Sequence, residues 1–334
     1  MGETELSVAE AELYDRQIRL WGIESQSRLR AANVLLIGIR GLGSEIAKNI
    51  LLSGINSLTI LDDGVVTDKE LLQNFLLNRD SIGQKIAEAV LSKAQALNPL
   101  VKITTDVKPL SEKPNTYYKD FTIVVATGLT TKQLIDIDSH CREFNVQFIC
   151  GDVFGMFGYS LADFQDHEYY VDQVRLPNRK RAHDGKASST NEVTTEKIQA
   201  KLNYPSINDA LLNTASSSKG KRKRGLQLYY LMKLLIQFRD KNGRNPTASS
   251  KKEDLEEMKI IREQYLQEYK IKEENFKEDV LNLVFGEITP ICSIVGGIVA
   301  QEVIKAVSHK EVPIHNMFLL NPYTFSGKEE MVGA

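Results

Sequence analysis

The sequence predicts an α/β protein built on a doubly wound, mainly parallel sheet with a mostly helical insertion. Three observations lead to this fold class. A strand, a glycine-rich turn, a helix and a second strand follow one another between residues 33 and 63. Strand and helix patterns then alternate up to residue 150, as they do in parallel sheets. The alternation stops between residues 176 and 285, where polar and helical segments replace it.

The first unit predicts a nucleotide-binding turn. A strand at 33–39 runs into a turn with three glycines, and a helix at 44–53 and a strand at 57–61 follow; two aspartates end that second strand. In Rossmann-like βαβ units such a turn brings a phosphate to the helix N-terminus, and an acid about 20 residues later binds the ribose. The candidate nucleotide-binding residues are the glycines of the turn and the first aspartate: Gly38, Gly41, Gly43 and Asp62.

One residue of the turn departs from the dinucleotide fingerprint. In G-x-G-x-x-G the middle glycine lets the backbone approach a pyrophosphate, and in this turn, GIRGLG, Arg40 stands at that position. A long cationic side chain there either folds over a bound phosphate or occupies its place. The turn therefore either binds a nucleotide or serves only to pack the helix on the strand, and the residues alone leave both interpretations open.

Composition and charge exclude several classes of protein. The 334 residues suffice for one large or two modest domains, and 42 basic against 44 acidic residues indicate no nucleic-acid partner. The three cysteines, Cys141, Cys150 and Cys292, lack CxxC spacing, so we expect reduced thiols in an intracellular protein and no metal site. The acidic N-terminus has no signal-peptide pattern. The longest apolar stretch, 288–307, contains charged residues, so we reject a membrane span.

Periodicity and end signals predict the remaining elements before residue 176. We expect helices at 13–31, 81–97 and 132–144, and strands at 101–107, 122–126, 146–150, 157–164 and 167–174. The last two strands are expected to be antiparallel and to lie at the edge of the sheet. Ser81 and Gln84 have the spacing of a capping box at the start of the second helix. The first helix is basic, and Ile18, Leu20 and Trp21 are expected to dock it.

The composition changes after residue 176. We expect a mobile polar stretch to about residue 225, then helices at 226–238, 256–269 and 276–285. Basic clusters at 176–181 and 219–225 are either nuclear-import signals or solvated loops. Thr289 and Pro290 occupy the N-cap and N1 positions of an apolar helix that ends at residue 307, and a last strand covers 317–320. The predicted domain organisation is residues 1–175, an insertion at 176–285, and residues 286–334, which complete the first part.

Four runs of residues resemble the ubiquitin-like-protein activating enzymes. They are YDRQIRLWG at 14–22, the turn at 38–43, GDVFGMFGY at 151–159 and ITPICSIVGGIVAQEVIK at 288–305. Their order and the length of the chain are most similar to the small subunits of SUMO-activating enzymes. The resemblance implies a ThiF-type fold, a pseudo-adenylation domain split by the insertion, and a heterodimer with a large catalytic subunit. In that heterodimer ATP adenylates the SUMO C-terminus, a cysteine of the large subunit takes it as a thioester, and the SUMO-conjugating enzyme is an indirect partner.

The resemblance also implies that the ATP site of this chain has decayed. Active subunits of the family have a glycine at the position of Arg40, an arginine at Gln73, a lysine at Ile86 and a magnesium-binding aspartate at Gly128. Adenylation depends on positioning and neutralising the phosphates. We therefore expect this chain to bind no cofactor productively, with ATP and Mg²⁺ in the partner subunit and Asp62 as a relic. The insertion contains no cysteine, so this chain is not expected to form the thioester.

The same resemblance assigns a role to Arg16. In the family the arginine of the YDRQ run enters the ATP site of the partner, where it stabilises charge on the polyphosphate as an arginine finger does. A guanidinium suits this role because it stays charged and binds phosphate oxygens in a fork. Arg19, one turn further along the helix, is the second candidate. From the residues alone, both are ordinary basic residues of a solvated helix.

Other functions remain alternatives at this point. A nicotinamide-dependent oxidoreductase shares the βαβ unit, but Arg40 in the turn argues against it. A self-sufficient homodimeric adenylating enzyme needs the lost aspartate and lysine, and usually CxxC zinc motifs. A small subunit for another ubiquitin-like protein is the third alternative, against which the compact length argues. We expect the protein in the nucleus, with the cytoplasm as a second location.

Overall fold

The computed structural model describes residues 7–175, 194–212 and 226–333. Its centre is an eight-stranded sheet in the order β10-β9-β6-β5-β4-β1-β2-β3. The five neighbouring strands β3, β2, β1, β4 and β5 are parallel. Strands β6, β9 and β10 continue the sheet beyond β5 in antiparallel pairs. The strands are β1 (Asn33–Ile37), β2 (Ser57–Leu61), β3 (Lys102–Asp106), β4 (Ile123–Thr127), β5 (Gln147–Phe154), β6 (Phe157–Asp163), β9 (Met317–Leu320) and β10 (Gly327–Glu330). The predicted α/β class with a mainly parallel, doubly wound sheet is confirmed.

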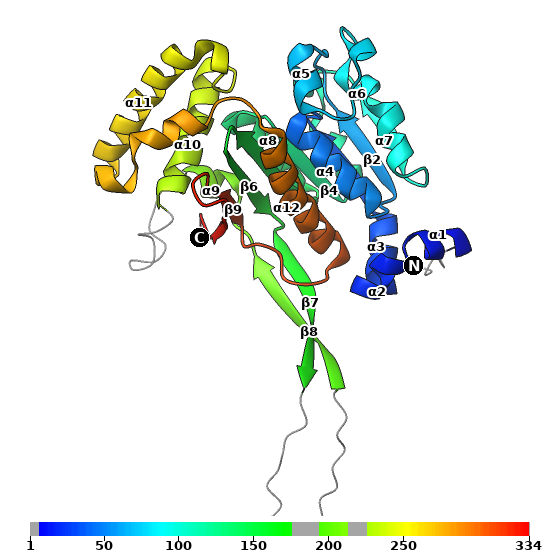
Figure 1. The fold of residues 1–334 in the computed structure, drawn as a ribbon. Coiled ribbons are helices and arrows are strands. Elements are labelled where there is room, and N and C mark those ends of the chain that lie inside the picture. Colours follow the sequence, from blue (N-terminus) through cyan, green and yellow to red (C-terminus); the bar gives the residue numbers. More distant parts are fainter. Residues whose placement is uncertain (1–6, 176–193, 213–225, 334) are drawn as a thin grey trace, which may run out of the picture.

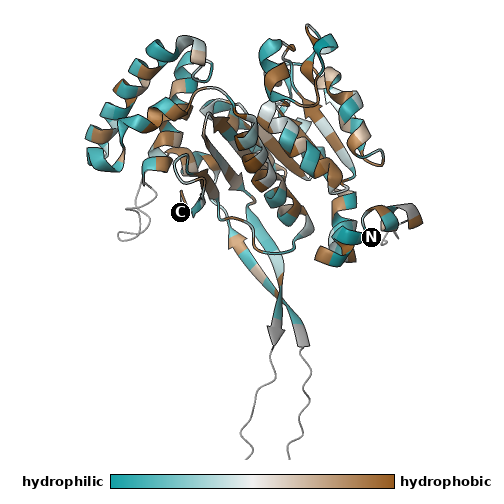
Figure 2. Ribbon diagram, viewed as in Figure 1, coloured by the Kyte–Doolittle hydropathy of each residue, from teal (hydrophilic) through white to brown (hydrophobic). Residues whose placement is uncertain are grey.

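Helices cover both faces of the sheet. Successive residues of a strand point to opposite sides, and here the residues on both sides are apolar. In β1, Val34 and Leu36 belong to one apolar cluster, and Leu35 and Ile37 belong to the other. The first face packs on α4 (Gly41–Leu52), α6 (Ile86–Ala89), α7 (Leu91–Leu97) and α12 (Thr289–Ser308). The second packs on α8 (Thr131–Glu143), α9 (Ile207–Leu212), α10 (Leu226–Asn242) and α11 (Lys251–Glu268). Figure 2 shows that hydrophobic residues are concentrated in the strands between these layers.

Helix α12 belongs to the core. Within the described residues it is the one helix with the length and hydropathy of a membrane span, and 61% of its apolar window is buried inside the protein. It packs closely on α4: a Cβ on Gly296 would lie 2.7 Å from the Cβ of Glu45. The apolar character of α12 is therefore explained by its place between α4 and the strands β5 and β6.

The helices after residue 206 are not a separate body. Leu231 and Phe238 of α10 and Met258 of α11 are buried in the same cluster as the second face of the sheet. The division of the chain into residues 1–175, an insertion at 176–285 and residues 286–334 stays a prediction. The ribbon formed by β7 (Asp166–Arg175) and β8 (Thr194–Asn203) projects from the body of the protein (Figure 1).

Several predicted elements are corrected by the structure. The N-terminal helix is divided into α1 (Val8–Leu13), α2 (Asp15–Trp21) and α3 (Ile23–Ala31), because Gly22 adopts φ +88° between the last two. The helix predicted at 81–97 begins only at residue 86. Ser81 ends a short 3-10 turn that Asn78 caps, and Gly83, with φ +82°, prevents the helix from starting there.

Further corrections concern the second half of the chain. Strand β7 pairs with β8 in a separate two-stranded sheet and does not lie at the edge of the main one. Residues 194–203 and 207–212, predicted to be mobile, form β8 and α9; both basic clusters, 176–181 and 219–225, lie outside the described residues. The helix predicted at 276–285 is a 3-10 turn, Glu278–Leu283. Thr289 is the first helical residue of α12, so its side chain does not cap the helix.

Candidate functional site

The glycine-rich turn lies between the carboxyl end of β1 and α4. The winding of the sheet reverses between β1 and β4, and in doubly wound sheets this reversal is where ligands bind. Gly38 adopts φ +86°, and a Cβ on it would lie 2.5 Å from Oγ1 of Thr127. A Cβ on Gly43 would lie 2.0 Å from the carbonyl oxygen of Gly38. These two glycines are therefore required for the close packing of turn, strand and helix, whatever the turn binds.

The structure brings Asp62 to this turn, as the sequence predicts, but its carboxylate faces inward. One oxygen accepts the N–H of Ile39 at 2.9 Å and the other accepts the N–H of Gly64 at 2.8 Å. Asn74, which sequence reasoning missed, donates to the carbonyl oxygen of Ile39 at 2.6 Å. Asp62 and Asn74 thus hold the turn from both sides, and Asp63 is the exposed acid of the pair.

The positions predicted to have lost their ATP contacts surround the same turn. Arg40 is exposed and stands at the N-cap of α4, where none of the described side chains forms a cap. Ile86 is buried in the core, while the neighbouring Lys85 donates to the carbonyl oxygen of Asp63 at 2.6 Å. Oε1 of Gln73, at the end of α5 (Asp68–Gln73), is buried and accepts no hydrogen bond from the described residues.

A buried ion pair lies at the carboxyl end of β4. Arg239 of α10 donates to Oδ2 of Asp152 at 2.6 Å and to the carbonyl oxygen of Leu129 at 2.9 Å. The N–H of Gly128 donates to the same carboxylate oxygen at 3.1 Å. A guanidinium therefore lies beside Gly128, the position that the family resemblance assigned to a metal-binding acid. Residue spacing gave no signal of this pair, because its members are 87 residues apart.

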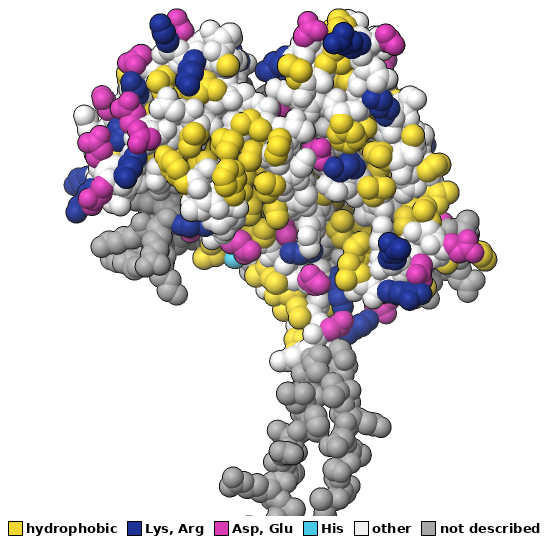
Figure 3. Space-filling view, viewed as in Figure 1, with side chains coloured by type: hydrophobic (Ala, Val, Ile, Leu, Met, Phe, Trp, Pro, Cys, Tyr) yellow, Lys and Arg dark blue, Asp and Glu magenta, His cyan; other side chains and the backbone are white. Residues whose placement is uncertain are grey.

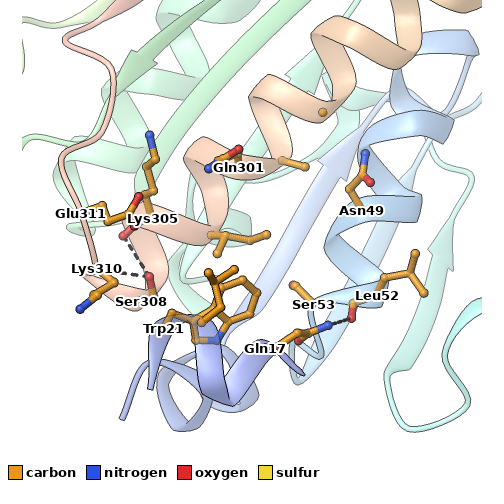
Figure 4. Close-up of a pocket in the computed structure, with 14 residues that line it drawn as sticks. Gln17, Trp21, Asn49, Leu52, Ser53, Gln301, Lys305, Ser308, Lys310 and Glu311 are labelled. Carbon is orange, nitrogen blue, oxygen red and sulfur yellow. Dashed lines mark hydrogen bonds between the residues drawn. The ribbon is translucent and has the colours of Figure 1, made fainter. Parts of the chain in front are cut away.

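The helix that carries Arg16 is anchored at the opposite end of α4. Tyr14 is 3% exposed and its hydroxyl accepts a hydrogen bond from Asn98 at 2.8 Å. Gln17 donates to the carbonyl oxygen of Leu52, the last residue of α4, at 2.8 Å (Figure 4). Tyr14 and Gln17 lie three residues apart and thus on one side of this part of the chain. The YDRQ run therefore contains two anchoring residues that flank Arg16.

Arg16 is exposed, and within the described parts of the chain it makes no hydrogen bond or ion pair. Arg19 is paired with Asp15 at 3.0 Å on the surface. The glycine turn lies at the first residue of α4 and Arg16 lies beside its last; a 12-residue helix is about 18 Å long. This exceeds the reach of an arginine side chain. Arg16 and the turn are consequently far apart in this chain, because α2 and the turn lie at opposite ends of α4 (Figure 1).

A groove of about 420 Å³ runs between α2, α4 and α12 beside Gln17 (Figure 4). Its lining includes Gln17, Leu20, Trp21, Leu52, Gln301 and Lys305. Leu20, predicted to dock its helix, is instead 74% exposed, and Leu52 is 44% exposed. Trp21 packs against the core, as predicted, and donates to Gln26 at 3.0 Å. Figure 3 shows hydrophobic side chains on the face of the molecule that includes α12.

The fold and the turn define a class: a doubly wound domain of the nucleotide-binding kind whose glycine turn lies at the reversal of the sheet. The sequence matches the ThiF family over residues 14–332. It is 36% identical to SUMO-activating enzyme subunit 1 of Rattus norvegicus and of Homo sapiens, over 98% of this chain and 96% of each relative. It is 34% identical to the Xenopus laevis protein of the same name, over 99% of this chain and 98% of that relative. The chain belongs to the ThiF family.

Two solved structures share the fold of this chain. PaaA aligns with a TM-score of 0.58 and 16% identity, over 99% of this chain and 76% of PaaA. MccB from E. coli aligns with a TM-score of 0.57 and 12% identity, over 99% of this chain and 72% of MccB. At these identities the likeness shows the fold alone.

Proposed function

We propose that this chain is the non-catalytic but required subunit of a heterodimeric SUMO-activating enzyme, and that Arg16 acts in the ATP site of the large subunit. The observation that carries the proposal is the placement of Arg16. Tyr14 and Gln17 fix the helix that carries Arg16, and Arg16 is exposed and unpaired within the described residues. The glycine turn of the same chain is out of its reach. The name shared by the relatives supplies SUMO as the substrate.

In this arrangement the large subunit binds ATP and Mg²⁺. The charge on the polyphosphate increases the cost of bringing the SUMO carboxylate to the α-phosphate. A cation supplied by a second subunit lowers that cost where charge develops in the transition state, and it requires no reorganisation if its helix is already fixed. Leu20, on the helix of Arg16, and Leu52 line the groove between α2, α4 and α12 and are exposed, which fits a surface that the large subunit covers.

The chemistry of the chain's own residues supports an inactive subunit. The turn has Arg40 in place of a glycine, Ile86 in the core in place of a lysine, and Gly128 in place of an acid. Cys141, Cys150 and Cys292 are all buried, and burial raises the pKa of each thiol. A buried thiol with a raised pKa is a poor nucleophile. The thioester is therefore assigned to the large subunit, and the SUMO-conjugating enzyme would receive SUMO from there.

ATP:pyrophosphate exchange in the presence of SUMO tests the proposal. Exchange is measured for this chain alone, for the pair with the large subunit, and for pairs carrying R16A or R19A. We expect exchange only in the pair, a loss of about tenfold to a thousandfold with R16A, and a near-normal rate with R19A, whose ion pair with Asp15 is exposed. Exchange by the chain alone contradicts the inactive-subunit assignment, and a fully active R16A pair contradicts the role of Arg16.

A further inference from the structure

The carboxylate of Glu287 lies against the first residue of α4. A Cβ on Gly41 would lie 2.7 Å from Oε2 of Glu287, and the Cβ of Gln73 and the Sγ of Cys292 would be 3.2 Å and 3.3 Å away. The carboxylate thus fills the side of the turn that Gly41 leaves open by having no side chain. In nucleotide-binding βαβ units, the N-terminus of this helix is where a phosphate comes to lie.

The backbone around Glu287 is fixed to the sheet. The N–H of Gly155 donates to the carbonyl oxygen of Gly286 at 2.6 Å, and the N–H of Met156 donates to that of Leu283 at 2.7 Å. Gly155 and Glu287 also form an isolated parallel bridge. The segment before α12 is therefore held on the turn between β5 and β6, and the position of the Glu287 carboxylate follows from the fold.

One oxygen of this carboxylate lacks a hydrogen-bond partner within the described residues. Oε2 of Glu287 is buried and accepts no hydrogen bond from the described residues. Burial, followed by the nearby charge of Asp152, raises the pKa of Glu287, although Lys69, Arg40 and Arg239 oppose the shift. A buried acceptor without a partner destabilises the folded state, so its presence calls for an explanation. The uncapped N-terminus of α4 provides part of one, because a helix N-terminus attracts an anion.

The opposite charge is also supplied by the chain. Arg239 is buried on Asp152 of β5, beside Gly128, which follows the end of β4. A magnesium–nucleotide complex would bring an anion to the N-terminus of α4 and a cation to the ends of β4 and β5. In this chain Glu287 provides an anion at the first place and Arg239 provides a cation at the second.

We propose that the charge of Glu287, held at the phosphate position of the nucleotide pocket expected at the glycine turn, excludes nucleotides from that pocket. The pocket is thus closed by a residue of its own, in addition to having lost contacts. This inference rests on the proposed function only in so far as both treat the pocket as inactive. The two fail separately, because exchange with R16A reports on the site of the large subunit, whereas nucleotide binding to this chain reports on its own pocket.

Binding of ATP with Mg²⁺, and of tripolyphosphate alone, to the full chain tests the proposal by calorimetry. The variants are E287Q, which keeps the size of the side chain and removes its charge, and E274Q as a control at an exposed carboxylate. We expect no saturable binding by the wild type or E274Q. With E287Q we expect binding at least about tenfold tighter than the limit set by the wild type, because a charge close to the phosphates has been removed.

Two results overturn the proposal: saturable ATP binding by the wild type, or the absence of any gain in E287Q that is folded by circular dichroism. E287D serves as the second variant should E287Q fail to fold. E287D keeps the charge but moves it away from Gly41 by the length of one methylene group. We therefore expect E287D to bind tripolyphosphate more tightly than the wild type, with a smaller gain than the one expected of E287Q. Affinity unchanged from the wild type in a folded E287D then counts against the proposal.

Discussion

Replacing Gly54 with alanine is expected to release the anchor of the helix that carries Arg16. Gly54 follows the end of α4 with φ +79°, and a Cβ on it would lie 2.5 Å from Cζ and 2.8 Å from the hydroxyl oxygen of Tyr14. The Tyr14 ring is enclosed and bonded to Asn98 at 2.8 Å, so it cannot move aside without leaving its site. The substitution therefore acts on α2 without touching Arg16.

The cost in free energy of unfolding has two parts. A left-handed backbone angle costs an alanine about 1–2 kcal/mol. Displacing a buried aromatic ring costs about 3 kcal/mol, at the lower end of what truncating such a ring costs. The sum, about 4–5 kcal/mol, is a large part of the stability of a typical domain. Of the two parts, only the second depends on Tyr14.

Urea denaturation followed by circular dichroism measures the cost, with G83A as the matched control. Gly83 has φ +82° and nothing within 4 Å of its Cβ position, so G83A carries the backbone strain without the collision. We expect G54A to lose about 3 kcal/mol more than G83A. Pairs made with G54A are also expected to lose exchange activity as R16A pairs do. Equal stability of the two variants would refute the anchoring role of Tyr14.

Buried groups elsewhere give three predictions. R239M is expected to cost about 3–5 kcal/mol in urea titrations by leaving Asp152 unpaired, with partial recovery in R239M/D152L; an additive loss would contradict the pairing. Burial, then the charge of His309, lowers the pKa of His167 from 6.5 to about 4, so folding favours the neutral ring. The free energy of unfolding therefore decreases as the pH falls from 6.5 towards 4. Over that range the melting temperature of H167Q is expected to fall less than that of the wild type, and an equal fall in both proteins would contradict this. G43A, whose Cβ would lie 2.0 Å from a carbonyl oxygen, should give little folded protein by circular dichroism, and a normal yield would refute the packing.

The sequence predicted the parallel strands because buried strands are apolar runs with glycine or polar ends. Strand β8 could not be predicted in this way. Its sequence, TTEKIQAKLN, belongs to a two-stranded ribbon that buries little, so no face of it has to be apolar. The prediction of a helix start at Ser81 was wrong for a different reason. The spacing of Ser81 and Gln84 fits a capping box, but the left-handed Gly83 between them rules out a helix there.

The site was predictable in its location and not in its contacts. The glycine turn and Asp62 are adjacent because a βαβ unit places them so. That Asp62 binds the N–H of Ile39, and that Arg239 lies on Asp152, depends on side-chain directions and on a helix far along the chain. The separation of Arg16 from the turn likewise depends on which end of α4 receives α2, and spacing in the sequence does not specify this.

Photolabelling tests the central claim most directly. The pair with the large subunit is irradiated with an ATP analogue that carries a photoreactive group on its γ-phosphate, and the labelled peptides are identified by mass spectrometry. Action of Arg16 in the partner's ATP site predicts that the label on this chain is found in α2, residues 15–21. Label at residues 38–43 of this chain, or on the large subunit alone, would contradict it.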